Sequence, residues 1–322
     1  MISCLDGARL LSQNWLNVKP SENTLIITNE GNIQEAFALF HAVEELEGIP
    51  SICIIPTERI NGQEPPTPIT EAMLKSDVII AATKFSIATT QARINSIKVG
   101  ARMLSVAMHS SVGKSVLESD MLTIDLEKVS ITVVKVASLL AEGNLIRVTS
   151  EKGTDLTIPI LGRKGNGLNG ICYKAGTFRS LSIEANIAPL EGKSYGKVAL
   201  DGSLCTDGLI QNCFTVILEN GKIINFGEGL DSKRFQNALK LINDDKMLFL
   251  GEFGIGLNPK AQCIGDSYIE DESALGTIHL GFGRNLSLGG EMNAKGHYDV
   301  VILRPTIYVD DILLMSNGEI VF

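Results

Sequence analysis

The chain has 322 residues, 44% hydrophobic and 20% charged, so it is long enough for a sizeable core and, by length, for two domains. Its net charge of −9 argues against nucleic acid or an anionic membrane surface as a partner, because both would repel an acidic protein. We recognise no secretory signal and no apolar run of the ~18 residues that span a bilayer. The six cysteines form no Cys-x-x-Cys pair, which is typical of free thiols in the cytoplasm.

Residues 1–142 alternate short apolar runs with longer amphipathic ones. A helix over 5–16 precedes the strand TLIITN, and the strands SICIIP, DVIIAAT and ARMLSVA follow with helices between and after them. Near-continuous apolar strands separated by helices predict a doubly wound parallel sheet. The first strand ends in TNEGNIQEA, which lacks the glycines of a dinucleotide-binding turn, so a nucleotide site is not indicated.

Residues 143–322 have a different pattern, in which short β-rich segments are separated by glycine. The segments are NLIRVTSEKG, TDLTIPILG, GICYKAG, GKVALDGSL, FTVILENGKIINFG and MLFLGEFGIG. SEKG and ENGK are suited to hairpin turns, and one helix, SKRFQNALKLINDD, interrupts the series. The pattern predicts an α+β domain with a largely antiparallel sheet.

Ionisable residues gather between Gly251 and Asp310, where Glu252, Glu272, His279, His297 and Asp299 all occur. TIHLGFG and HYDVVIL are typical strands, in which alternate side chains share a face, so His297 and Asp299 point the same way. Imidazole and carboxylate together favour zinc, manganese, cobalt or ferrous iron. The alternative is that each histidine is a structural residue with a satisfied hydrogen bond.

Glu272 is a further candidate of uncertain role. It could orient His279, but its neighbours Glu270 and Asp271 favour an exposed acidic face. Tyr298 and Arg284 are candidates for contact with substrate, and for Arg284 a surface ion pair is an equal alternative.

The C-terminal half resembles the metallo-aminopeptidases of the aminopeptidase T and aminopeptidase S type, through SIEANIAP, GEFGIGLNP, DESALGTIHLGFG and HYD. The resemblance implies a homodimer and two divalent ions, zinc, cobalt or manganese. The ligands that it implies are Glu184, Glu252, His279, His297 and Asp299. Water held between the ions would attack the peptide carbonyl, with Glu184 and Glu252 as catalytic carboxylates. The family's tyrosine ligand has no counterpart near Leu286, and Tyr298 or Tyr268 could replace it.

A second resemblance, through GxxGxGLNP and His-Tyr-Asp, is to the 2,5-dihydroxypyridine dioxygenases. It implies one ferrous ion held by two histidines and an aspartate, and one of those histidines falls at Glu252. Glutamate at this position gives the site more oxygen ligands than the dioxygenase site would have. The main interpretation is therefore an aminopeptidase that releases N-terminal residues from small peptides. The alternative is an Fe(II) ring-cleaving dioxygenase acting on a dihydroxypyridine-like aromatic, and the third is a scaffold that has lost catalysis.

Overall fold

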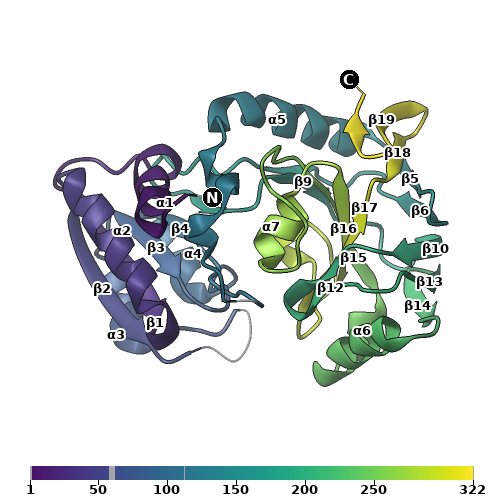
Figure 1. Ribbon diagram of the computed structural model, residues 1–322, viewed down its shortest axis with the longest axis horizontal. Helices are drawn as coiled ribbons and strands as arrows, with labels where there is room; N and C mark the ends of the chain where they lie inside the picture. The colour runs from purple at the N-terminus through teal and green to yellow at the C-terminus, as the bar shows by residue number, and fades with distance from the viewer. Residues whose placement is uncertain (1, 58–61, 112, 322) are drawn as a thin grey trace. The chain divides into compact units, whose positions relative to one another are not determined.

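The computed structural model describes residues 2–57, 62–111 and 113–321, and its chain divides into two compact units (Figure 1). The first unit is Met1–Lys128 with Asn169–Ser182, and the second is Val129–Leu168 with Ile183–Phe322. A parallel sheet with helices and a region rich in antiparallel sheet are both present, which confirms the predicted fold class. The predicted boundary after residue 142 stays a prediction.

The first unit contains a five-stranded parallel sheet in the order β2-β1-β3-β4-β8. The apolar runs of the sequence form its strands, and β3 is buried along its whole length because helices cover the sheet. The strands are β1 (Asn23–Asn29), β2 (Ile49–Ile55), β3 (Val78–Ala82), β4 (Arg102–Ser105) and β8 (Phe178–Ser180). The helices are α1 (Cys4–Leu10), which continues as a π-helix over Leu11–Trp15, α2 (Ile33–Glu45), α3 (Thr67–Met73) and α4 (Gln91–Lys98).

The segment GICYKAG was predicted as a strand of the second domain, and this prediction is wrong. Residues 171–177 form no strand, and the adjacent β8 pairs in parallel with β4 of the first unit. The segment is held in the first unit by contacts with its N-terminal part, where the backbone N–H of Cys172 donates to Trp15 O at 2.9 Å. Gly176, at φ +72°, adopts a turn conformation that a strand does not use.

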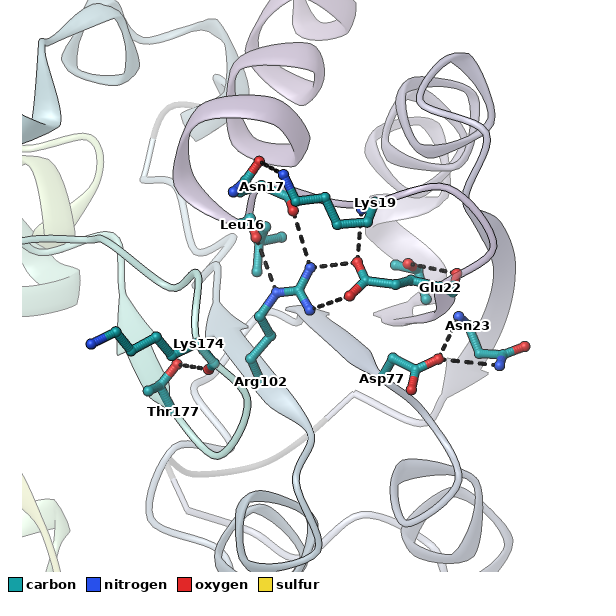
Figure 2. A network of polar contacts seen from close by, with 10 residues as sticks. Leu16, Asn17, Lys19, Glu22, Asn23, Asp77, Arg102, Lys174 and Thr177 are labelled. Carbon is teal, nitrogen blue, oxygen red and sulfur yellow. Dashed lines mark hydrogen bonds and ion pairs between the residues drawn. The ribbon is translucent and has the colours of Figure 1, made fainter.

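A buried arginine at the start of β4 forms a network of hydrogen bonds at one end of the parallel sheet (Figure 2). Arg102 lies at the start of β4 with 5% of its surface exposed. Its guanidinium donates to both carboxylate oxygens of Glu22, at 2.7 and 2.5 Å, and to the carbonyls of Leu16 and Asn17. Burial disfavours the charged form of Glu22, but the hydrogen bonds from Arg102 outweigh it, so the pKa of Glu22 is lowered. Arg102 therefore ties β4 to the segment that leads into β1.

The second unit contains two antiparallel sheets and the helices α5 (Leu126–Glu142), α6 (Leu230–Leu241) and α7 (Tyr268–Ser273). Along the eight-stranded sheet, the order is β14 (Lys222–Asn225), β13 (Phe214–Glu219), β10 (Tyr195–Leu200), β6 (Asp155–Pro159), β5 (Leu145–Thr149), β18 (Thr306–Val309), β19 (Ile312–Ser316) and β20 (Glu319–Ile320). Along the seven-stranded sheet, it is β12 (Gly208–Leu209), β11 (Ser203–Leu204), β17 (His297–Leu303), β16 (Thr277–Gly283), β15 (Leu250–Gly256), β9 (Glu184–Ile187) and β7 (Asn166–Leu168). SEKG and ENGK connect neighbouring strands, as predicted.

The seven-stranded sheet has two chemically different faces. One face is apolar and packs on α6, where the ring of Phe235 lies 5.6 Å from that of Phe282 and 5.9 Å from that of Tyr298. The other face carries histidines, carboxylates and glycines, and α7 packs against it at β15 and β16 (Figure 1). Most side chains on both faces are buried, and His297 at the start of β17 is partly exposed.

The structure also bears on the membrane and redox expectations. In the described ranges, every helix is too short or too polar to cross a bilayer. All six cysteines are free thiols, as the lack of paired spacing predicts.

Candidate metal centre

The five predicted ligands lie on the polar face of the seven-stranded sheet. Glu184 comes from β9, Glu252 from β15, His279 from β16, and both His297 and Asp299 from β17. The strands are neighbours in the order β17-β16-β15-β9, and each ligand occupies a position whose side chain points to the same side. Residues up to 115 positions apart in the sequence are thus brought together by strand pairing.

Each of these ligands faces a glycine on an adjacent strand. Glu184 is paired with Gly256, His279 with Gly254, both Glu252 and Asp299 with Gly281, and His297 with Gly283. A Cβ atom on Gly254 would lie 2.0 Å from Nε2 of His279, and one on Gly281 would lie 2.5 Å from the ring of His297. Only glycine leaves room for the imidazoles to lie across the neighbouring strand.

The ligand atoms form two groups that share Glu252. Glu184, Glu252 and His279 form one, and Glu252, His297 and Asp299 form the other; within each, the atoms lie within 4.8 Å of one another. Nε2 of His279 is 3.6 Å from Glu184 Oε2 and 3.5 Å from Glu252 Oε1. Nε2 of His297 is 2.9 Å from both Glu252 Oε2 and Asp299 Oδ1. Glu252 therefore lies between the two imidazoles, where it could bridge two cations.

Backbone and amide groups orient the ligands. Nδ1 of His297 donates to the carbonyl of Arg284 at 2.7 Å, which directs Nε2 toward Glu252 and Asp299. Asn186 Nδ2 donates to Glu184 Oε1 at 2.8 Å, and Asn166 Nδ2 donates to Asn186 at 3.1 Å. The two asparagines were not identified from the sequence, although Asn186 follows Glu184 at strand spacing.

Burial and mutual charge displace the pKa values of these groups. Burial raises the pKa of Glu184 to about 7, against the attraction of His279. Burial likewise opposes ionisation of Glu252, but its contacts with His279 and His297 prevail and lower its pKa to about 2. Burial disfavours imidazolium as well, yet the charge of Glu184 and the hydrogen bond to Glu252 raise the pKa of His279 to about 10.

Glu272 belongs to the same cluster, and its prediction as an exposed residue is wrong. It is 7% exposed, because α7 turns this side chain inward, and burial followed by the charge of Asp299 raises its pKa well above its ordinary value. The acidic run Glu270–Glu272 is buried throughout. Its composition resembled a solvated face, but the packing of α7 on the sheet decides otherwise.

The donor set fits divalent metal. Four carboxyl groups (Glu184, Glu252, Glu272 and Asp299) gather around two imidazoles, and burial together with repulsion between the carboxylates raises the pKa values of Glu184 and Glu272. Glu184 Oε2 is buried and accepts no hydrogen bond from the described residues. Crowded carboxyl groups and a buried oxygen without a hydrogen bond are costly unless a cation compensates them. Mixed nitrogen and oxygen donors suit zinc, manganese, cobalt or ferrous iron.

The side chains of the two candidate substrate residues, Tyr298 and Arg284, do not lie at the ligand cluster. Tyr298 alternates with its neighbours, so it points to the apolar face, where its hydroxyl donates to Asp207. The side chain of Arg284 is exposed, and its carbonyl is the part that contacts His297. Tyr268 on α7 is buried, and burial followed by the charges of Glu272, Cys205 and Asp299 raises the pKa of its hydroxyl, which therefore lies within electrostatic range of the cluster.

The fold and the donor set together define a protein with a candidate divalent-metal site on an antiparallel sheet. The 2,5-dihydroxypyridine 5,6-dioxygenase family model matches residues 14–322, so the chain belongs to this family. The 2,5-dihydroxypyridine 5,6-dioxygenase of Pseudomonas putida KT2440 is 25% identical over 144 residues. That match spans 41% of this chain and 41% of the relative, less than half of its length.

Two solved structures share the fold over its whole length. A 2,5-dihydroxypyridine dioxygenase from Pseudomonas putida KT2440 has a TM-score of 0.82 and 18% identity, covering 100% of this chain and 98% of that one. Wild-type AmpT from Thermus thermophilus has a TM-score of 0.69 and 14% identity, covering 99% of both chains. The family match thus favours the second resemblance seen in the sequence, and the first is supported at the level of the fold.

Proposed function

We propose that this protein is a non-haem Fe(II) dioxygenase that opens the ring of a dihydroxypyridine-like aromatic. The observation that carries the proposal is the family match over residues 14–322. It reverses the preference drawn from the sequence, in which the aminopeptidase stood first. The buried donor set on the seven-stranded sheet supports the same class, since its nitrogen and oxygen ligands suit ferrous iron.

Glu252, His297 and Asp299 are the residues that would hold the iron. Bound ferrous iron supplies the chemistry of oxygen activation. The carbonyl of Arg284 fixes the ring of His297 so that Nε2 faces the site. Glu184, whose pKa is raised to about 7, is able to hold or release a proton near neutral pH. The set has one histidine and two carboxylates, whereas the resemblance implied two histidines.

A second candidate is a metal-dependent aminopeptidase, favoured by one specific observation. Glu252 belongs to both ligand groups, an arrangement that suits two bridged divalent ions. A pair of ions supplies water of lowered pKa for hydrolysis. In that case His279 and Glu184 would hold the second ion, and the substrate would be a small peptide.

Two assays separate the candidates. Protein loaded anaerobically with ferrous iron is given 2,5-dihydroxypyridine, and oxygen consumption is measured; protein loaded with zinc, cobalt or manganese is given leucyl peptides, and free amino acid is measured. We expect oxygen consumption that His297→Ala abolishes with folding intact. Release of amino acid without oxygen consumption would replace the dioxygenase with the hydrolase. The absence of both activities would favour the scaffold that has lost catalysis.

The remaining expectations from sequence are proposals of the same kind. A homodimer is implied by the aminopeptidase resemblance, and light scattering that gives the mass of one chain would refute it. A cytoplasmic location, indicated by the free thiols, is tested by fractionation of cells that express the protein.

A further inference from the structure

The short helix α7 packs directly beside the ligand cluster. A Cβ atom on Gly256 would lie 2.2 Å from the carbonyl oxygen of Ala274 and 2.7 Å from that of Glu272. Gly256 is the strand partner of Glu184, so the close approach places the end of α7 next to a ligand. Ser273 fixes this position, since its Oγ accepts the N–H of Ile183 at 3.1 Å. The helix is held rigidly over the polar face of the sheet.

The acidic side chains of α7 have different environments. Asp271 is structural, because its Oδ1 accepts the backbone N–H groups of Ile264 and Gly265 at 2.9 and 3.0 Å. Glu272 has no such role: its Oε1 is buried and makes no hydrogen bond within the described residues. The charges of Asp299, His279, Glu184 and Glu252 are among those that act on Glu272, so its carboxyl group lies beside the cluster. Among the described residues, its Oε1 has no hydrogen-bond partner there.

An unpaired buried carboxyl group is unfavourable for folding. A group left without a hydrogen bond loses the interactions that it makes with water in the unfolded chain, and replacing it by an apolar residue would remove that cost. Glu272 is also outside both groups of ligand atoms that lie close enough to share a cation. Neither packing nor metal binding accounts for a glutamate at this position, which leaves a bound molecule as the partner of its free oxygen.

We propose that Glu272 is a substrate-binding residue that accepts a hydrogen bond from an N–H or O–H group next to the metal-binding oxygen of the substrate. The inference rests on the proposed function only in requiring that substrate reach the metal. For a dihydroxypyridine the donor is the ring N–H or a hydroxyl; for a peptide it is the free amine. Tyr268, one helical turn earlier, lies in the same wall, because Glu272 and Asp299 both act on its hydroxyl.

Acetohydroxamate tests the inference without depending on the reaction, because it binds metal through its oxygens and carries an N–H beside them. The probe is titrated calorimetrically into metal-loaded wild type, Glu272→Gln, Glu272→Leu and the control Glu270→Gln on the same helix. We expect affinity to fall about 10-fold or more in Glu272→Leu, because the acceptor is lost, and by much less in Glu272→Gln, which keeps an acceptor oxygen. The control should match wild type, with metal content equal in all four proteins.

Every other outcome overturns the inference. Unchanged affinity in Glu272→Leu would mean that the side chain does not touch the bound molecule. Loss of metal from that variant would make Glu272 a ligand, and failure to fold would make it structural. The proposed function fails separately: wild type that binds the probe but consumes no oxygen with 2,5-dihydroxypyridine would refute the dioxygenase and leave the role of Glu272 intact.

Discussion

Arg102 in the first unit and Glu184 in the second are both buried and ionisable, and they differ in how completely their neighbours satisfy them. Arg102 has a carboxylate and two carbonyls within hydrogen-bonding distance, so its charge is matched. Glu184 lies among further carboxylates, and one of its oxygens has no hydrogen bond to any residue that the structure describes. A matched buried charge supports the fold, whereas an excess of one sign marks a place prepared for a ligand.

The largest expected effect on stability comes from Arg102, whose charge is matched by its hydrogen-bond partners. Arg102→Leu should lower the free energy of unfolding by about 2–4 kcal/mol, because it leaves the partly buried Glu22 and the carbonyls of Leu16 and Asn17 without their shared donor. Urea denaturation of the metal-free protein measures the change. Lys19→Ala, a nearby exposed residue, is the control and should change little. A loss below ~1 kcal/mol would mean that Arg102 does not hold the first unit together.

The candidate metal site should lose function when a side chain is added at one of the glycines that face its ligands. Gly254→Ala should reduce activity and metal affinity about 100-fold, because the new Cβ would overlap Nε2 of His279 and displace the ring. Gly31→Ala is the matched control, since a Cβ there meets no atom within 4 Å. Metal titration and turnover of both variants check the prediction, and equal behaviour of the two would remove the role assigned to the glycines.

The two clusters should also depend on pH with opposite signs. The pKa values of Glu184 and His279 are raised, to about 7 and about 10, so the stability that they contribute is present at low pH and lost as pH rises through those values. The pKa of Glu22 is lowered, so its contribution is present above its ordinary value of 4.5 and lost as pH falls.

Metal-free protein should therefore lose on the order of 1–3 kcal/mol of stability between about pH 5 and 9, from the site groups alone. Bound metal replaces the protons and should flatten the dependence. Denaturation series with chelator and with metal provide the measurement. A metal-free protein whose stability rises over this range would contradict the assigned directions.

The smallest expected effect is at Tyr298, which lies on the apolar face of the same sheet. Tyr298→Phe should cost about 1 kcal/mol of stability through loss of its hydrogen bond to Asp207. Metal content and substrate affinity should be unchanged, because the hydroxyl points away from the ligands. A change in affinity greater than about threefold would restore Tyr298 as a substrate residue.

Much of this fold could be predicted from the sequence because its signals are local. The apolar runs that became β1, β3 and β4 determine the parallel sheet, and the glycine-bounded runs determine the antiparallel ones. β8 was missed because it has only three residues and its place is set by pairing with β4. No periodicity within so short a segment can indicate which sheet it joins.

Residue type, order and family resemblance predicted which side chains would gather at the candidate site, whereas the surroundings of these side chains were not predicted. Gly254 and Gly281 face His279 and Glu252 only because of the strand register, which depends on contacts distant in sequence. The buried state of Glu272 depends in the same way on how α7 packs. Tyr298 was recoverable from the sequence, since alternation along HYDVVIL places it opposite His297 and Asp299.

The most direct test of the central claim is the metal content of protein purified without chelator, measured per chain on wild type and on Glu252→Ala. Since Glu252 belongs to both ligand groups, we expect at least one divalent ion per chain in wild type and its loss in the variant. One iron would accord with the dioxygenase, and two zinc, cobalt or manganese ions with the hydrolase. A wild type that binds no metal when supplied with each of these ions, or a variant that keeps its full complement, would contradict the site described.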